Sequence, residues 1–227
     1  MYKRQGYSTT AIALGVGATF SSTFQFRFTN TGGIDPADGI TFVLAQSATG
    51  LGGLGGGLGY AGVGNSVAIE FDTYNNGEAG GSNHVAVDVN GVLNNFASAN
   101  PYGQSNCTTG NNIRQGCMSN GSIWSATVSY DGTTKLLNVF LQDGGNAIEH
   151  LITDYSIDLA ATLGTTSAFV GFTGATGAGY ENQDILNWRL ANDTSLGNPN
   201  RLPEPTSLAL LTLAGLASIG ASRRRRA

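Results

Sequence analysis

Two acidic residues inside an apolar run constrain the fold of this chain more than any other feature. Glu70 and Asp72 stand two apart in the run VAIEFD, residues 67–72. Because successive side chains of a strand point to opposite faces, both carboxylates would share one face while Val67, Ile69 and Phe71 enter a core. Such a strand needs a second layer of structure to cover its apolar face. The alternative is a surface strand that carries two solvated acids.

Residues that suit metal ions follow the acidic pair. Asn76 and His84 come next, across a turn that contains several glycines. Carboxylate and amide oxygens suit a hard cation such as Ca²⁺, and an imidazole beside carboxylates suits a transition metal. The pattern therefore predicts a double metal site. The alternative is a lone histidine in a hairpin beside a solvated strand.

Short apolar stretches separated by glycine-rich turns predict an all-β fold. The chain has 227 residues, of which 34 are glycine and 11% are charged. Strand patterns cover residues 24–28, 40–44, 67–71, 84–89, 123–130, 136–141, 167–172 and 185–190. Many short strands joined by such turns are typical of a β-sandwich, and about 200 residues is an ordinary size for one. The one helix expected is an apolar helix at the C-terminus.

The charge balance argues against a nucleic-acid partner. The whole chain carries a net charge of −4, but four of its basic residues lie at 223–226. Residues 1–202 contain seven basic and 14 acidic residues, a net charge of −7. Nucleic-acid binding needs a basic surface, so we expect metal ions and neutral ligands instead.

Four further motifs, taken in order around the acidic pair, resemble those of the legume-type (L-type) lectins. They are DGITFVL at 38–44, LGGLGGGLGYAG at 51–62, VGFTGATG at 170–177 and DILNW at 184–188. The resemblance extends from about residue 19 to residue 190. It implies a jelly-roll β-sandwich like that of concanavalin A, in a protein that binds carbohydrate and is not an enzyme.

The lectin resemblance assigns roles in the metal site. Its six positions would be Glu70, Asp72, Tyr74, Asn76, Glu78 and His84. In the family, such a strand motif holds a transition metal, for example Mn²⁺, beside Ca²⁺. Glu70 and His84 would bind the transition metal, and Asp72 would bridge both ions. Tyr74 would offer its carbonyl oxygen to Ca²⁺, and Asn76 its side-chain oxygen.

The same resemblance implies a sugar pocket beside the metals. Its residues would be Asp38, Gly59, Tyr74, Asn76, Ala178 and Gly179. Asp38 would follow a cis peptide bond and accept two sugar hydroxyls in charge-assisted hydrogen bonds. Asn76 would donate its amide, Gly59 a backbone N–H, and Tyr74 would offer a ring face. The loop at 177–180 would present backbone N–H groups to the ligand.

Two cysteines, Cys107 and Cys117, enclose a polar segment. In an exported protein they would pair and pin a long loop. Closing a loop of this length contributes roughly 3 kcal/mol through chain entropy. The alternative is a pair of free thiols. A metal site is disfavoured, because no other cysteine or histidine lies near them in the sequence.

The C-terminal residues resemble a bacterial sorting signal. Pro-Glu-Pro at 203–205 precedes 17 uncharged, mostly apolar residues at 206–222 and four arginines at 223–226. A helix of this length spans about 26 Å, near the minimum for crossing a bilayer. The arrangement resembles the PEP-CTERM signal of Gram-negative bacteria. That resemblance implies an exosortase that removes the tail and delivery to the cell surface or extracellular matrix; a permanent membrane anchor is the alternative.

The N-terminus lacks the basic, apolar and cleavage regions of a signal peptide. We therefore expect residues 1–5 to be a non-native start of a truncated sequence. Residues 6–195 would form the lectin-like sandwich, residues 196–205 a linker, and residues 206–227 the sorting tail.

Two other functions remain open. Glu78 stands where the family has an aspartate, so the chain could be a matrix or adhesion protein with a degenerate sugar site. Some jelly-roll glucanases carry Glu-x-Asp-x-x-Glu, with two catalytic glutamates. Here the position three after Asp72 is Asn75, which disfavours a glycoside hydrolase. Calcium-dependent sugar binding would separate a working lectin from a degenerate one, and hydrolysis of a β-glucan would identify an enzyme.

Overall fold

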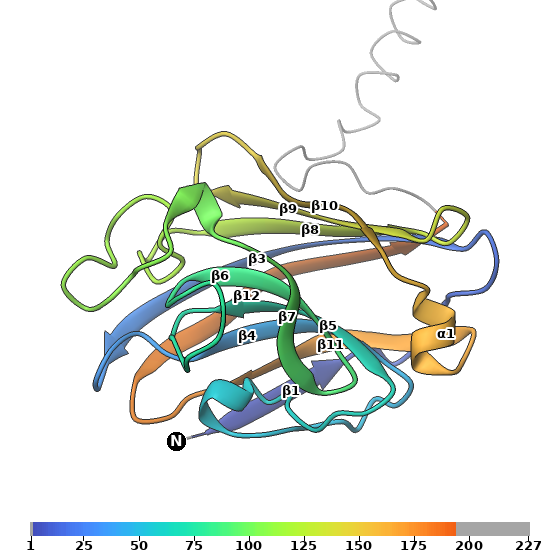
Figure 1. The fold of residues 1–227 in the computed structure, drawn as a ribbon, viewed down its shortest axis with the longest axis horizontal. Helices are drawn as coiled ribbons and strands as arrows, with labels where there is room; N and C mark the ends of the chain where they lie inside the picture. The colour runs from blue at the N-terminus through green and yellow to red at the C-terminus, as the bar shows by residue number, and fades with distance from the viewer. Residues whose placement is uncertain (1, 194–227) are drawn as a thin grey trace, which may run out of the picture. The chain divides into compact units, whose positions relative to one another are not determined.

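Two antiparallel sheets face each other in the computed structural model, which describes residues 2–193. The larger sheet has seven strands, in the order β1 (Lys3–Tyr7), β11 (Ser167–Ala175), β4 (Gly39–Ala45), β5 (Ser66–Asp72), β6 (His84–Val89) and β7 (Val92–Ala99), with β2 (Ile12–Ala13) beside β11. The smaller sheet has five, in the order β10 (Glu149–Ser156), β9 (Leu136–Asp143), β8 (Trp124–Asp131), β3 (Thr19–Gly32) and β12 (Tyr180–Asn192). Figure 1 shows them as two layers, and the predicted all-β sandwich is confirmed.

Aromatic residues of β3 fill the space between the layers. Phe24, Phe26 and Phe28 are fully buried and lie on one face of the strand, as their spacing of two requires. The centroid of the Phe24 ring lies 4.9 Å from that of Phe172 on β11 and 5.7 Å from that of Phe42 on β4. Rings from both sheets therefore pack together in one core.

A second covering lies on the outer face of the larger sheet. Every residue of β4 and β5 is buried, including those whose side chains point away from the main core. On this outer face Tyr60 and Val63 pack against Val43, Ala45 and Ala68. The strand that carries the acidic pair is thus enclosed on both faces, and the alternative of a solvated acidic strand is wrong.

Local sequence explains the turn between β6 and β7 and the ends of a short helix. Asn90 and Gly91 join β6 to β7 with φ values of 54° and 73°, the left-handed conformation that a tight hairpin turn requires. A short helix, α1 (Leu159–Leu163), precedes β11 and was not predicted from the sequence. Asp158 caps it by accepting a hydrogen bond from Ala161 N at 3.1 Å, and Gly164 ends it with φ 68°.

The predicted N-terminal boundary of the domain is corrected by the structure. β1 pairs with β11 from Lys3 to Tyr7, so residues 3–5 are part of the larger sheet and not a segment outside the sandwich. The predicted linker at 196–205 and the tail at 206–227 lie outside the described residues. Within residues 2–193, no helix has the length and apolar character that a membrane crossing requires.

Candidate functional site

The acidic pair and the histidine meet at one end of β5 and β6. Asp72, the last residue of β5, is paired with His84, the first residue of β6. Ligand atoms of Glu70, Asp72 and His84 all lie within 4.8 Å of one another, and the three residues are buried. One cation can contact oxygen and nitrogen atoms at this spacing, so these three residues, called the acid–histidine cluster below, fit the predicted transition-metal site.

The His84 ring directs its Nε2 atom toward the Glu70 carboxylate. His84 Nδ1 lies 3.0 Å from the carbonyl oxygen of Gly81, an acceptor, so Nδ1 carries a proton and donates it. His84 Nε2 lies 3.0 Å from Glu70 Oε1. In a neutral imidazole the second nitrogen has no proton, so two lone-pair atoms face each other. A cation bound to both atoms would remove this repulsion.

Carboxyl groups are crowded around the cluster. Burial, together with the charge of Glu70, raises the pKa of Asp72 well above its usual range. The same two causes, in the same order, raise the pKa of Asp88 on β6 to about 8. Buried carboxyls crowded in this way either hold protons or bind cations.

Sequence reasoning missed two neighbours of the cluster, Asp88 and Asn95. Asp88 shares a face of β6 with His84, because the two are four residues apart, and this even spacing was the available signal. Asn95 Nδ2 lies 3.0 Å from His84 Nε2. Its Oδ1 is buried and has no hydrogen-bond partner among residues 2–193. Asn95 lies on β7, which was not predicted as a strand.

The turn after β5 contains the predicted calcium ligands. Asp72 Oδ1 accepts a hydrogen bond from Tyr74 N at 2.7 Å. The side-chain amide of Asn76 lies against Gly56, where any Cβ would overlap it. Glu78 Oε1 accepts from Asn76 N at 3.1 Å and is not a member of the acid–histidine cluster. The structure therefore gathers Asp72, Tyr74 and Asn76 in one turn, and Glu78 braces that turn.

Asp38 lies at the same end of the larger sheet, where three loops converge. The peptide bond Ala37–Asp38 is cis, as the resemblance implied. Asp38 Oδ2 is buried and has no hydrogen-bond partner among the described residues. A Cβ on Gly177 would lie 3.4 Å from this oxygen and a Cβ on Gly55 would lie 3.9 Å from it. Burial raises the pKa of Asp38 to about 6. A buried acceptor without a partner is placed to receive a hydrogen bond from a ligand.

The predicted role of Gly59 is wrong. Its N–H donates to the carbonyl oxygen of Gly53 at 2.8 Å and is therefore not available to a sugar. Gly59 is buried and has a φ of 68°, which places it in a turn against β11. Gly55 and Gly56 are the glycines of this loop that approach Asp38 and Asn76. A run of glycines with no side chains gave no way to tell these positions apart in the sequence.

The predicted specificity loop packs beside the Asp38 loop. Ala178 and Gly179 lie between β11 and β12, and the Gly177 N–H donates to the Gly179 carbonyl oxygen at 3.1 Å. A Cβ on Gly179 would overlap the carbonyl oxygen of Asp35. The two loops thus touch through their backbones, and the structure brings Ala178 and Gly179 close to the pocket as predicted.

The buried carboxyl of Glu181 links two loops near the candidate site. Glu181 accepts hydrogen bonds from Thr73 Oγ1 at 2.7 Å and from Ser119 Oγ at 2.6 Å. Burial raises the pKa of Glu181 to about 7, although both hydroxyl hydrogen bonds act in the opposite direction. The residue joins the turn after β5 to the loop before β8, and the sequence gave no sign of this role.

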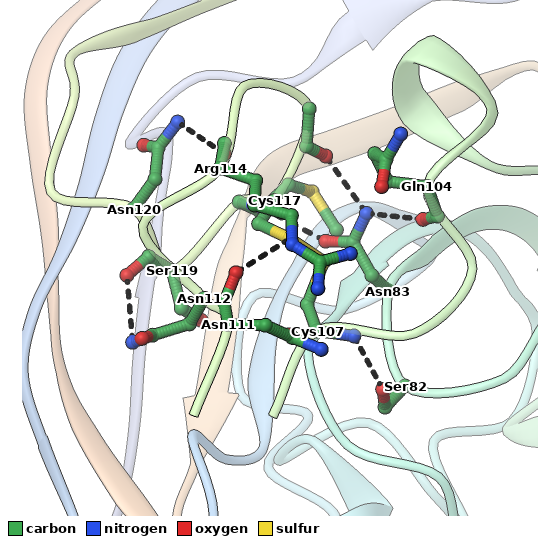
Figure 2. Close-up of a disulfide and its surroundings, with 12 residues drawn as sticks. Ser82, Asn83, Gln104, Cys107, Asn111, Asn112, Arg114, Cys117, Ser119 and Asn120 are labelled. Atoms are coloured by element: carbon green, nitrogen blue, oxygen red, sulfur yellow. Dashed lines mark hydrogen bonds between the residues drawn. A yellow bond between two sulfur atoms is a disulfide. The ribbon is translucent and has the colours of Figure 1, made fainter. Parts of the chain in front are cut away.

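Cys107 and Cys117 form a disulfide that closes a loop beside the metal turn. Figure 2 shows Asn83, the residue before His84, at the base of this loop. Asn83 is fully buried. Its Nδ2 donates to the carbonyl oxygens of Gln104 at 2.7 Å and Gly116 at 2.8 Å. One amide therefore holds both ends of the disulfide loop, and its neighbour in the chain belongs to the acid–histidine cluster.

A cleft lies apart from the acid–histidine cluster and the Asp38 pocket, and none of the predicted site residues lines it. It has a volume of about 620 Å³ and runs between β1 and β12, with Tyr2 and Trp188 among its walls. Its size alone does not identify it as the functional site, because the acid–histidine cluster, the unpartnered Asp38 oxygen and the loops of Gly55 and Gly177 all lie elsewhere.

Comparison with known proteins connects this geometry to one family. The model of the legume lectin domain matches residues 8–205. The L-type lectin-domain containing receptor kinase VIII.1 of Arabidopsis thaliana is 31% identical over 82% of this chain and 26% of its own length. Agglutinin-2 of Cladrastis kentukea is 32% identical over 75% of this chain and 57% of its own length. This chain thus spans about a quarter of the first relative and somewhat more than half of the second.

Solved structures show the same architecture. A lectin from Bauhinia forficata in complex with GalNAc has a TM-score of 0.67 at 25% identity, covering 85% of this chain and 81% of that one. Basic winged bean lectin with Tn-antigen also has a TM-score of 0.67, at 26% identity, covering 85% and 79%. The jelly-roll sandwich predicted from the sequence is therefore confirmed at the level of the fold.

Proposed function

This chain belongs to the legume lectin domain family, and on that premise we propose that it is a metal-dependent carbohydrate-binding protein exported to a bacterial surface or extracellular matrix. The observation that carries the proposal is the buried Asp38 oxygen without a partner, which faces glycine loops beside the acid–histidine cluster. The relatives named above are lectins or, in the receptor kinase, a protein that contains an L-type lectin domain, and we assign this domain a binding role and no catalytic one.

Neutral hydroxyl groups are the ligands that suit this pocket. An ionised Asp38 can accept hydrogen bonds from two sugar hydroxyls, and each is strengthened by the charge. Asn76 is exposed, and its side chain lies against Gly56, the neighbour of the Gly55 that approaches Asp38; it would donate to a ring or hydroxyl oxygen. The glycines allow the ligand to approach the backbone closely.

The metal ions would supply positive charge to a site rich in buried carboxyls. Glu70, Asp72 and His84 would hold Mn²⁺ or another transition metal, and Asp72 would extend to Ca²⁺ with the Tyr74 carbonyl oxygen and Asn76. Cations at these positions would keep the turn after β5 ordered, so that Asn76 stays beside Asp38. Glu78 braces the same turn by accepting the hydrogen bond from Asn76 N.

Export through the C-terminal tail completes the proposal. The Pro-Glu-Pro segment, apolar run and arginine cluster support recognition by an exosortase at the inner membrane. A disulfide in the sandwich fits an oxidising compartment outside the cytoplasm. The acidic body of the chain gives no basic surface for a nucleic acid.

Sugar binding with and without divalent ions tests the function. We expect the protein to bind at least one of the methyl glycosides of mannose, glucose, galactose and N-acetylgalactosamine in Ca²⁺ and Mn²⁺, and to bind none in EDTA. The melting temperature should fall in EDTA, because ions that bind only the folded state stabilise it.

Two outcomes contradict the proposal in different ways. Equal sugar binding and equal melting in both buffers would remove the metal requirement. Metal-dependent melting without binding to any glycan on a broad array would favour the alternative, an adhesion or matrix protein with a degenerate sugar site, for which the position of Glu78 outside the acid–histidine cluster is the supporting observation.

A further inference from the structure

The chain contains three Asn-Gly dipeptides, at 76–77, 90–91 and 120–121. Such a dipeptide can undergo an intramolecular reaction. The backbone nitrogen of the glycine attacks the side-chain Cγ of the asparagine and gives up its proton, ammonia leaves, and a five-membered succinimide ring remains. Glycine favours this step because it has no Cβ to hinder its nitrogen and adopts many backbone conformations. The reaction therefore depends on how firmly the fold holds both residues.

The Asn90-Gly91 dipeptide is held in the hairpin between β6 and β7. Asn90 Oδ1 accepts a hydrogen bond from Ser66 N at 3.2 Å, and the Asn90 N–H donates to the Ser66 carbonyl oxygen at 2.8 Å. Gly91 is buried, and its N–H donates to the Tyr60 hydroxyl at 3.1 Å. Neither the asparagine side chain nor the attacking nitrogen can move without breaking these contacts.

The side chain of Asn120 is bound through both of its polar atoms. Its Nδ2 donates to Asp143 Oδ2 at 2.9 Å and to the Arg114 carbonyl oxygen at 3.3 Å, and Figure 2 shows the second of these bonds. Its Oδ1 accepts from Ser122 N at 2.9 Å and from Trp124 Nε1 at 3.3 Å. Four hydrogen bonds therefore keep the Asn120 amide in place.

The Asn76-Gly77 dipeptide has far fewer restraints. Both residues are exposed, and the Asn76 side-chain amide has no hydrogen-bond partner among residues 2–193. It lies against Gly56, which has no side chain to confine it. Gly77 has a φ of 100°, and no atom lies within 4 Å of the position of a Cβ. The Gly77 N–H donates to Asn75 Oδ1 at 2.7 Å, and Asn75 is itself exposed.

We propose that Asn76 is a modification site, where the chain deamidates spontaneously while the turn after β5 holds no metal ion. Water would open the succinimide at either carbonyl and give aspartate or isoaspartate. Either product replaces the amide donor with a negative charge, and isoaspartate also inserts a methylene into the backbone. Sugar binding would therefore be lost as the ion-free protein ages. The modification itself is independent of the proposed function, and its effect on sugar binding rests on that function.

A bound cation would protect the residue. Ca²⁺ on Asn76 Oδ1 would keep the side chain from turning toward Gly77 N. Ions at about ten times their Kd should slow deamidation about tenfold, because they lower the fraction of ion-free protein by that factor.

Peptide mapping by mass spectrometry tests the modification. The full chain is kept in mildly alkaline buffer with EDTA, and the conversion of each asparagine is followed with time. Asn76 should convert at least about tenfold faster than Asn90 and Asn120, because each of these must first break two or more hydrogen bonds. Asn75→Ala removes the acceptor of the Gly77 N–H and should raise the rate at Asn76 by about threefold or more. Thr153→Ala, at an exposed position on β10, is the control and should leave the rate unchanged.

The converted chains carry one more negative charge and can be separated by anion exchange. Isothermal titration calorimetry then compares converted and unconverted protein in Ca²⁺ and Mn²⁺, with the four methyl glycosides named above as probes. The converted fraction should bind at least about tenfold more weakly, since residue 76 no longer donates a hydrogen bond to the sugar.

The outcomes separate the modification from the proposed function. Equal rates at the three asparagines, or no conversion of Asn76 in EDTA, would overturn the modification site. Equal rates at Asn76 with and without ions would overturn its protection by a cation. Conversion with unchanged glycoside affinity would overturn its effect on sugar binding. If fresh protein binds no sugar, the proposed function fails, and the relative rate at Asn76 still decides the modification.

Discussion

A buried carboxylate oxygen without a hydrogen-bond partner destabilises a protein unless a ligand or ion completes it. Asp38 carries such an oxygen, while its backbone is well bound: the Asp38 N–H donates to Ala175 and its carbonyl oxygen accepts from Thr73. The fold therefore depends on the main chain of this residue and not on its side chain. Burial raises the pKa of Asp38, and a backbone hydrogen bond from Gly177 to the carboxyl lowers it by less. The Gly177 N–H also donates to the Gly179 carbonyl oxygen at 3.1 Å and keeps that partner when the side chain is changed.

Asp38→Ala should abolish sugar binding and leave the melting temperature unchanged or slightly raised. The variant loses the charged acceptor but creates no unpaired buried group. Asp38→Asn should bind at least about tenfold more weakly than the parent, because its amide oxygen accepts without the charge. Calorimetry and thermal unfolding in Ca²⁺ measure both effects. Tight sugar binding by Asp38→Ala would show that the pocket lies elsewhere.

Glu181 should make the stability of the metal-free protein depend on pH. Its pKa in the folded state is about 7, against 4.5 for the free side chain, so the folded protein keeps a proton that the unfolded chain releases. This contribution is complete below about pH 4.5 and is lost as the pH rises through 7. At pH 8, Glu181→Gln should therefore be more stable than the parent, by up to roughly 3 kcal/mol.

Urea unfolding in EDTA at pH 5 and pH 8 measures the effect of Glu181→Gln. The variant should lose less stability than the parent between these two values. The control is Asp154→Asn at an exposed carboxyl, which should show the same pH dependence as the parent. Parallel curves for the parent and Glu181→Gln would mean that Glu181 is ionised in the folded protein throughout this range.

Among the elements, strands with a strong internal pattern were predictable and those defined by their neighbours were not. The alternation of Phe24, Phe26 and Phe28 with polar residues predicts β3, and the dipeptide Asn90-Gly91 predicts a hairpin turn. By contrast, β1 is exposed at four of its five positions, three polar residues and a glycine. It is a strand because β11 offers a partner, and tertiary pairing of that kind leaves no periodic signal in the sequence.

The residues of the candidate site divide in the same way into those that the sequence pattern predicts and those that it does not. Glu70, Asp72 and His84 were predictable because strand geometry places them on one face. Gly59 was misplaced, because successive glycines differ only in the backbone path, which the sequence does not specify. Asn83, Asp35 and Glu181 were missed because their importance comes from contacts between distant loops.

The disulfide loop should contribute to stability as an element. Replacing both Cys107 and Cys117 with serine should lower the free energy of unfolding by about 2–3 kcal/mol, since the unfolded chain gains freedom when the crosslink is removed. Urea unfolding in Ca²⁺ measures this, with reduced wild-type protein as the comparison. The fold should survive, because Asn83 still binds both ends of the loop. An unchanged unfolding curve would show that the crosslink does not constrain the unfolded state.

At the scale of the whole molecule, the proposed sorting tail is separate in sequence from the described sandwich. The described sandwich ends with β12 at Asn192, and the apolar run begins 14 positions later at residue 206. Removal of the tail near the Pro-Glu-Pro segment would leave every strand, both proposed metal sites and the sugar pocket intact. On the proposed function, a change in the tail should alter sorting and leave sugar recognition unaltered.

The exported protein should end near Pro205. Mass spectrometry of material from outside the inner membrane, in a Gram-negative host with sorting machinery, should find the processed form. Changing Pro203, Glu204 and Pro205 to alanine should cause the uncleaved chain to accumulate in the membrane fraction. Exported protein that retains the arginines at 223–226 would show that the segment is a simple anchor.

The attachment of both ends of the disulfide loop to Asn83 has a use in protein engineering. A segment whose ends are fixed by one buried amide and one crosslink behaves like a hypervariable loop on an immunoglobulin framework. Residues 109–115 could be randomised in a display library while Gln104, Cys107, Gly116 and Cys117 are kept. On the proposed function, selection from such a library should yield binders for different glycans on one sandwich scaffold.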